Sequence, residues 1–345
     1  MRIKYLLLIF KPIQSLLPVQ LIIKKFLIIC LFYTIVPSKL LLAASDNIDR
    51  GIIALMYHRF DENKYPSTNI KMKDFIKQIN LIKENNFYFI NANQFETDLL
   101  KKKNKKKILI TIDDGFLSFY KNAWPVLKKN KIPFILFVST KEVGSRGYMN
   151  WEQIKEIANE NFVHIGNHSH SHGYLIDQND KEIINDINKS ITIFENNLGY
   201  NSKFFSYPFG EYGNKFKKIV KDLGFKYAFG QHSGVIDETK NFYELPRYPI
   251  NEKYGELERF KLLLNTLPLK VKSITPTERY INNSNNPPNI IINFYEDIKG
   301  LKNLKCYSNE NNIWRESNIK FLNNSKLQII LEDKFKSERG RVNCS

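Results

Sequence analysis

Apolar and polar positions follow two different patterns between residues 51 and about 250. Short apolar runs bounded by polar residues predict buried strands, and apolar residues three and four positions apart predict helices. We predict strands at 52–57, 108–112, 134–138, 163–166, 204–207 and 227–229. We predict helices at 72–83, 123–129, 151–158, 181–197 and 215–223. Such repeated strand–helix units indicate a parallel sheet, either closed as a barrel or open and doubly wound, with its chemistry at the carboxyl ends of the strands.

The pattern changes after Ile250. One more helix, at 257–264, is followed by a polar stretch rich in Asn and Pro at 282–289. Short β-like runs come next, at 290–295, 304–307, 319–322 and 327–331. We therefore predict one α/β domain at 45–265 and a small accessory β-rich domain, with an antiparallel sheet, at 266–345.

The N-terminus holds two apolar runs, Leu16–Ile23 and Phe26–Val36, separated by two lysines. The second run has a basic pair before it and Leu42-Ala43-Ala44 after it, which is typical of a secretory signal. Each run is too short to span a bilayer alone, and an uncleaved anchor stays open as the alternative. Residues 1–44 are thus predicted to be a signal peptide or an N-terminal membrane anchor. The rest of the chain is expected to be periplasmic or extracellular.

Cysteine usage agrees with export. Cys30 lies in the N-terminal segment, which leaves Cys306 and Cys344. In an oxidising compartment these two are expected to form a disulfide.

The formal net charge of +17 favours anionic partners such as acidic glycans or phospholipid head groups. The chain is rich in Lys throughout, however, which indicates a general compositional bias instead of one basic patch. No nucleic-acid-binding motif accompanies the charge, so we exclude nucleic acid as a partner.

Two adjacent carboxylates follow the strand predicted at 108–112, in the run Thr111-Ile112-Asp113-Asp114-Gly115. At a strand end, two neighbouring acids can divide their roles, one binding a metal and the other remaining free as a base. An ordinary turn is the alternative, because Asp and Gly are favoured in turns.

Three histidines follow the strand predicted at 163–166, in the run Gly166-Asn167-His168-Ser169-His170-Ser171-His172. If this segment curls, His168 and His172 come onto one side, and if it stays extended, His170 joins them. Imidazoles together with one carboxylate form a three-ligand metal site that leaves positions open for water. A chance cluster in a loop is the alternative.

Together, these two motifs resemble the polysaccharide deacetylase family with the NodB homology domain (carbohydrate esterase family 4), over roughly residues 50–250. The resemblance implies a distorted (β/α) barrel that hydrolyses N- or O-linked acetyl groups on sugars. It implies Asp113 as the catalytic base and Asp114, His168 and His172 as ligands of a divalent metal, commonly zinc. His170 falls on a variable position of the motif. The ligand set also suits cobalt, nickel or iron.

A third match is Phe205-Ser206-Tyr207-Pro208-Phe209-Gly210, where the family often has Arg-x-Pro-Tyr. Pro208 matches, and the backbone N–H of Phe209 can contribute to the oxyanion hole, as any non-proline residue can. Ser206 stands where the family's arginine would be. Arg247, which follows the last predicted barrel strand, is the candidate to replace it, with a surface salt bridge as its alternative role.

The family's usual general acid, in a Leu-x-His segment, has no match in this chain. His232, in Gln231-His232-Ser233-Gly234, is our candidate for that role, and an ordinary loop histidine is the alternative. His58 ends the first strand and therefore faces the predicted site. We assign His58, Pro208 and Arg247 to substrate binding.

The resulting hypothesis is a metal-dependent N-deacetylase of polysaccharide that contains N-acetylhexosamine, acting outside the cytoplasm. Its partner would be an acetylated polysaccharide or cell-envelope glycan, and an uncleaved N-terminus would associate with the membrane. A glycan-binding protein that has lost catalysis and a deacetylase of lipid-linked sugar are the alternatives. The sequence leaves the particular polymer and the oligomeric state open.

Overall fold

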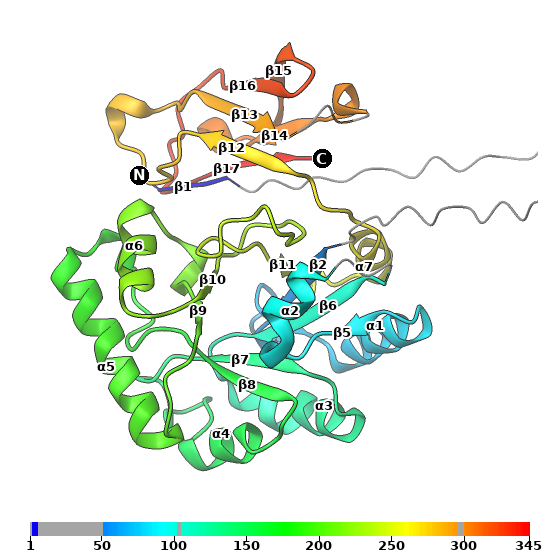
Figure 1. Cartoon of the computed structure of the whole chain (residues 1–345), viewed down its shortest axis with the longest axis vertical. Helices are drawn as coiled ribbons and strands as arrows, with labels where there is room; N and C mark the ends of the chain where they lie inside the picture. The colour runs from blue at the N-terminus through cyan, green and yellow to red at the C-terminus, as the bar shows by residue number, and fades with distance from the viewer. Residues whose placement is uncertain (1, 6–50, 102–104, 296–297, 299) are drawn as a thin grey trace, which may run out of the picture.

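Two large β-sheets organise the part of the chain that the structure describes (Figure 1). The structure is a computed structural model and describes residues 2–5, 51–101, 105–295, 298 and 300–345. The apolar runs predicted as a secretory signal or membrane anchor lie outside these residues. Within the described ranges, no helix is both long and apolar enough to cross a membrane.

The first sheet is parallel, with the strand order β10-β9-β8-β7-β6-β2-β11 and with β5 paired beside β6. Its strands are β2 (Ile52–Tyr57), β5 (Tyr88–Phe89), β6 (Lys107–Ile112), β7 (Phe134–Val138), β8 (Val163–Asn167), β9 (Phe204–Ser206), β10 (Tyr227–Phe229) and β11 (Tyr248–Pro249). All the predicted strands are present, with ends shifted by at most one residue. The two-residue strands β5 and β11 are too short to give a sequence pattern.

Residues 245–249 bring the two ends of this sheet together. Leu245 forms a parallel bridge with Phe229 of β10, and Tyr248 pairs with Leu55 of β2. One short segment therefore spans the gap between the last and the first strand. The prediction of a distorted (β/α) barrel is confirmed, and the open, doubly wound alternative is wrong.

Helices pack around the barrel, most of them on its outside, whereas α2 (Phe95–Leu100) packs Phe95 and Leu99 against the interior core. The helices are α1 (Met72–Glu84), α2 (Phe95–Leu100), α3 (Trp124–Asn130), α4 (Trp151–Ala158), α5 (Asp180–Leu198), α6 (Asn214–Asp222) and α7 (Leu257–Leu264). Alternate residues of β2 point to opposite sides of the sheet. Ile53 and Leu55 pack with the helices outside the barrel, and Ile52 and Ala54 pack in its interior. A short parallel pair, β3 (Arg59–Phe60) with β4 (Asn69–Ile70), precedes α1.

The second sheet lies above the barrel in Figure 1, with the order β1-β17-β14-β15-β16-β13-β12. Its strands are β1 (Arg2–Tyr5), β12 (Val271–Thr275), β13 (Ile290–Phe294), β14 (Cys306–Ser308), β15 (Arg315–Asn323), β16 (Lys326–Ile330) and β17 (Arg339–Cys344). All its pairs are antiparallel except β1 with β17. The antiparallel accessory domain is confirmed. Residues 2–5 join it as an edge strand, although the sequence interpretation placed this segment outside the fold.

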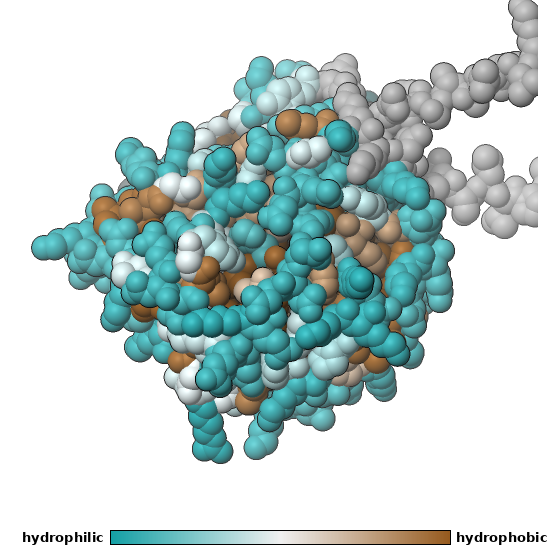
Figure 2. Space-filling view, turned by 60° about the horizontal axis from the view of Figure 1, so that its bottom comes forward, coloured by the Kyte–Doolittle hydropathy of each residue, from teal (hydrophilic) through white to brown (hydrophobic). Residues whose placement is uncertain are grey.

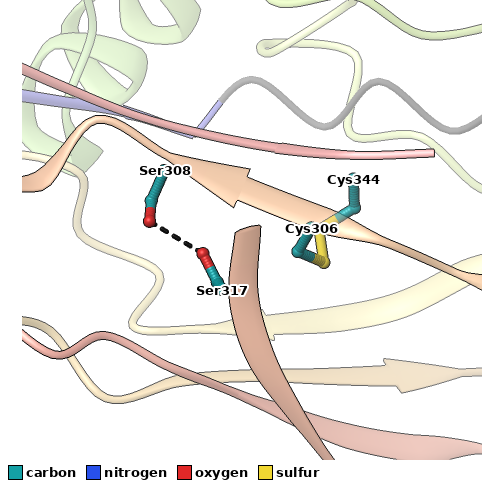
Figure 3. Close-up of a disulfide and its surroundings, with 4 residues drawn as sticks. All are labelled: Cys306, Ser308, Ser317 and Cys344. Atoms are coloured by element: carbon teal, nitrogen blue, oxygen red, sulfur yellow. Dashed lines mark hydrogen bonds between the residues drawn. A yellow bond between two sulfur atoms is a disulfide. The ribbon is translucent and has the colours of Figure 1, made fainter. Parts of the chain in front are cut away.

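The predicted disulfide is confirmed, because Cys306 of β14 is bonded to Cys344 of β17 (Figure 3). In the same part of the sheet, the hydroxyls of Ser308 and Ser317 lie 2.7 Å apart and share a hydrogen bond. Both cysteines are fully buried in the apolar core of the second domain. The disulfide therefore ties the last strand of the chain to its neighbour.

On the face shown in Figure 2, hydrophilic residues predominate and apolar ones form separate patches between them. Such a surface is ordinary for a globular protein.

Candidate active site

The two carboxylates and the histidine cluster lie at the carboxyl ends of strands in one region of the barrel. Asp113 and Asp114 follow β6, and His168 follows β8, two strands away in the sheet. Asp114 Oδ1 is 3.3 Å from His168 Nε2 and 3.2 Å from His172 Nε2. One ligand atom from each of these three residues lies within 4.8 Å of the others. The loop curls, which brings His168 and His172 together.

The side chain of His170 is not part of this three-residue set. Its Nδ1 lies 2.9 Å from the hydroxyl of Thr140. The backbone N–H groups of His170 and Ser171 donate to the carboxylate of Asp186 on α5, at 2.9 and 3.1 Å. These hydrogen bonds hold the curl of the loop against the helix.

Four non-glycine residues at this site have left-handed backbone conformations: Asp114 (φ 75°), Ser169 (φ 68°), His172 (φ 51°) and Phe209 (φ 58°). Such conformations are uncommon outside glycine and cost free energy, so they persist only where surrounding contacts hold them. Their concentration around three converging side chains is typical of a functional site.

The hydrogen bond made by His168 sets its tautomer. Its Nδ1 lies 2.7 Å from the backbone carbonyl oxygen of Ser206, which can only accept. Nδ1 therefore carries the proton, and the lone pair of Nε2 points toward Asp114. A histidine held in this way is prepared to bind a metal.

The three side chains fit a divalent cation. Asp114 Oδ1 is buried and accepts no hydrogen bond of good geometry, although two imidazole nitrogens approach it. Burial would raise the pKa of Asp114, but the adjacent His168 and His172 hold this pKa well below its ordinary value. Burial would lower the pKa of His172, and the nearby Asp114 raises it instead. A carboxylate and two imidazoles around one point form a three-ligand set that leaves room for water or substrate.

Asp113 is fully buried beside this set and is held by Arg247. Its Oδ1 accepts from Arg247 Nη1 at 2.7 Å, and its Oδ2 accepts from Nη2 at 2.8 Å. The hydroxyl of Ser206 also donates to Oδ2, at 3.2 Å. Burial would raise the pKa of Asp113, but the charge and hydrogen bonds of Arg247 outweigh it and lower this pKa. Asp113 is therefore an ionised carboxylate at neutral pH, with Oδ2 3.9 Å from His168 Nε2.

A family model for polysaccharide deacetylases matches residues 100–228, which include both carboxylates and the histidine cluster. This chain carries a polysaccharide deacetylase domain. The resemblance drawn from the motifs is confirmed.

Relatives and solved structures agree with this match. Poly-β-1,6-N-acetyl-D-glucosamine N-deacetylases of Staphylococcus aureus are 26% identical over 238 residues, covering 59% of this chain and 80% of theirs. The solved structure of IcaB from Ammonifex degensii is 24% identical with a TM-score of 0.56, and the match covers 63% of this chain and 98% of that one. The Streptococcus pyogenes deacetylase PplD, in complex with acetate, is 22% identical with a TM-score of 0.57 and the same coverage. These two structures share the barrel fold of the deacetylase domain.

Arg247 lies inside the deacetylase barrel because it belongs to the segment that closes the sheet. Its side chain is fully buried, so the alternative of a surface salt bridge is wrong. Its Nε donates to the carbonyl of Gly230 at 2.9 Å, and its Nη1 donates to the hydroxyl of Thr111 at 3.1 Å. Its Nη2 donates to Ser206 Oγ at 2.9 Å. The small side chain of Ser206 leaves room for an arginine that comes from the segment before β11.

Phe209 lies at the edge of the same site. It follows Pro208 directly, and its ring centroid is 4.7 Å from that of His172. The ring of Tyr174 is stacked on that of Phe209, with ring centroids 4.0 Å apart. The structure thus brings the loop with Pro208 and Phe209 against a candidate metal ligand.

The two remaining histidine candidates, His58 and His232, have different surroundings. His58 lies within the electrostatic reach of Asp114 and Asp113, whose charges partly oppose the lowering of its pKa by burial. The Nδ1 of His232 lies 3.3 Å from the hydroxyl of Tyr212. His232 lines a cavity of about 440 Å³ whose walls include residues 267–279, between the barrel and the second sheet. Neither Asp113 nor any of the three metal-ligand candidates lines that cavity.

Proposed function

We propose that this protein is a metal-dependent N-deacetylase that hydrolyses acetyl groups of a polysaccharide containing N-acetylhexosamine. One observation carries the proposal: the ionised, buried carboxylate of Asp113 lies beside a separate Asp/His/His set that fits a divalent metal. A protein that only bound glycan would have no use for a free base next to the metal ligands.

The relatives suggest the substrate class. The S. aureus proteins named above are N-deacetylases of poly-β-1,6-N-acetyl-D-glucosamine. We propose a β-1,6-linked N-acetylglucosamine polymer as the first substrate to test. The disulfide between Cys306 and Cys344 supports a location in an oxidising compartment outside the cytoplasm, where we propose that the protein meets this polymer.

The residues divide the reaction between them. A bound cation, for which we propose zinc, would polarise the acetyl carbonyl and lower the pKa of a water molecule. Asp113 accepts a proton from the attacking water, and Arg247 keeps Asp113 ionised and fixes its orientation. The backbone N–H of Phe209 donates to the oxyanion as it develops. The carbon–nitrogen bond then breaks, the nitrogen takes a proton and leaves as the sugar amine, and acetate is released.

We propose roles for Arg247 and His232 that differ from those expected from the sequence. Arg247 is enclosed in the barrel, and we assign it to positioning Asp113 instead of contacting substrate. We assign proton donation to the leaving amine to His58, because His58 follows β2, the strand that pairs with β6, whereas His232 lines a different cavity.

A pair of histidine variants tests this last assignment. We expect His58→Gln to lower kcat for acetate release by about 100-fold, since a positioned acid contributes on that order. His232→Gln should stay within about threefold of the wild type. Initial rates at saturating substrate and zinc measure both effects. A large loss in His232→Gln with a normal His58→Gln would restore His232 as the acid.

The test of the function itself is acetate release from β-1,6-linked N-acetylglucosamine oligomers by the purified protein. We expect release that stops on chelation and returns when zinc or cobalt is added. Metal binding without release from either β-1,6- or β-1,4-linked oligomers would contradict the proposal and favour a glycan-binding protein.

A further inference from the structure

The second domain reaches the active-site loops through Arg339, the first residue of β17. The Nε of Arg339 forms an ion pair with Glu211 Oε1, and its Nη2 donates to the hydroxyl of Tyr174 at 3.1 Å. The guanidinium carbon lies 5.4 Å from the ring centroid of Tyr174 and 5.5 Å from that of Phe209. One side chain of the accessory sheet thus contacts three residues of the barrel.

Those three residues come from the two loops that form the site. Tyr174 follows the loop that carries His172, and Phe209 and Glu211 follow β9. The rings of Tyr174 and Phe209 are stacked, with an interplanar angle of 10°. Phe209 in turn packs against the ring of His172. A continuous chain of contacts therefore runs from Arg339 to a candidate metal ligand.

These contacts involve two residues whose backbone conformations need support from their surroundings. Both His172 and Phe209 have left-handed backbone conformations, which surrounding contacts must hold in place. The carboxylate of Glu211 is only 4% exposed, so it depends on a cation to offset its burial. Arg339 provides that cation and packs against the stacked rings at the same time.

We propose that Arg339 is a positioning residue through which the C-terminal domain holds the loops of His172 and Phe209 in their active geometry. Because it concerns the metal ligand and the oxyanion donor, this inference rests on the proposed function. The inference gives the accessory domain a definite role. This domain supports the active-site loops and does not act only as a separate glycan-binding module.

The test compares Arg339→Ala with Arg341→Ala in the full-length protein. Arg341 lies two residues along the same strand and is exposed, so its replacement removes the same charge without touching the loops. We expect Arg339→Ala to weaken zinc affinity about tenfold, measured by competition with a chelating dye. The absorption spectrum of the cobalt-loaded protein should change as well. At saturating zinc, kcat should fall about tenfold with little change in KM, because the oxyanion donor acts in the transition state.

A further variant separates positioning from general destabilisation. Arg339→Ala removes a cation that pairs with the buried carboxylate of Glu211, and Glu211→Gln in the same chain removes the charge of that carboxylate. The double variant should regain thermal stability, whereas its zinc affinity and kcat should remain low because the stacked rings are still unsupported. Arg339→Lys should fall between the wild type and Arg339→Ala, since it restores the charge but not the planar contact.

Zinc affinity and the cobalt spectrum test the role of Arg339 independently of activity. If the wild type releases no acetate, the proposed activity is wrong, but these two measurements still test the inference. Identical zinc affinity and cobalt spectra in Arg339→Ala, Arg341→Ala and wild type would overturn it. Full recovery of zinc affinity in the double variant would also overturn it, by reducing Arg339 to a counter-ion for Glu211.

Discussion

Asp113→Asn is expected to lower kcat for acetate release by about 10² to 10⁴, the usual contribution of a positioned general base. The amide has nearly the shape of the carboxylate but cannot accept the proton of the attacking water. Metal binding should survive, because Asp114, His168 and His172 form the ligand set without Asp113. Activity and zinc content measured on the same preparation test this separation.

The matched control is Asp114→Asn, the neighbouring carboxylate. It should lose zinc together with activity, because Asp114 supplies a ligand atom to the set. The assignment of the two roles would be contradicted if Asp113→Asn kept its rate within tenfold, or if it lost zinc as completely as Asp114→Asn does.

Arg247→Met is expected to reduce both stability and activity strongly. It removes the charge that is hydrogen-bonded to both oxygens of Asp113, inside a barrel where neither side chain is exposed. Breaking a buried ion pair from one side costs about 3–5 kcal/mol. Urea unfolding near neutral pH measures this cost, with Arg247→Lys as the milder comparison.

The pH profile of the same variant tests the electrostatic role. In the wild type the pKa of Asp113 lies below its ordinary value of 3.8, so the base stays ionised at any higher pH. The stabilisation from the pair is accordingly present above that value and is lost as the pH falls through the lowered pKa. Without Arg247, burial dominates and raises this pKa. The acid limb of kcat/KM should therefore move to higher pH in Arg247→Met, and an unmoved limb would contradict the role of Arg247.

Much of the barrel and the metal-ligand candidates could be predicted because the signals are local. Buried parallel strands give continuous apolar runs, and polar residues directly after such runs must lie at one edge of the sheet. Asp113, Asp114 and His168 follow this rule. The convergence of His172 required the loop to curl, and the curl is held by backbone N–H groups that donate to Asp186 on the following helix α5, a contact that the local pattern does not predict.

Features that depend on long-range packing could not be predicted in the same way. Arg247 pairs with Asp113 across 134 positions of sequence, and its burial follows from sheet closure by a segment with only a two-residue strand. The strand β17 reads Arg-Gly-Arg-Val-Asn-Cys, and its inward side is Gly340, Val342 and Cys344. Because Val342 is the one aliphatic residue in this strand, its sequence shows no clear alternation of apolar and polar positions. The sequence therefore predicted neither this strand nor the position of Arg339.

The most direct test of the central claim compares His168→Ala with His170→Ala, in zinc content and in acetate release from β-1,6-linked N-acetylglucosamine oligomers. The two histidines lie in the same loop, but only His168 belongs to the ligand set. We predict that His168→Ala loses both zinc and activity, and that His170→Ala retains zinc and a rate near that of the wild type. Zinc-dependent acetate release that persists in His168→Ala would contradict the account.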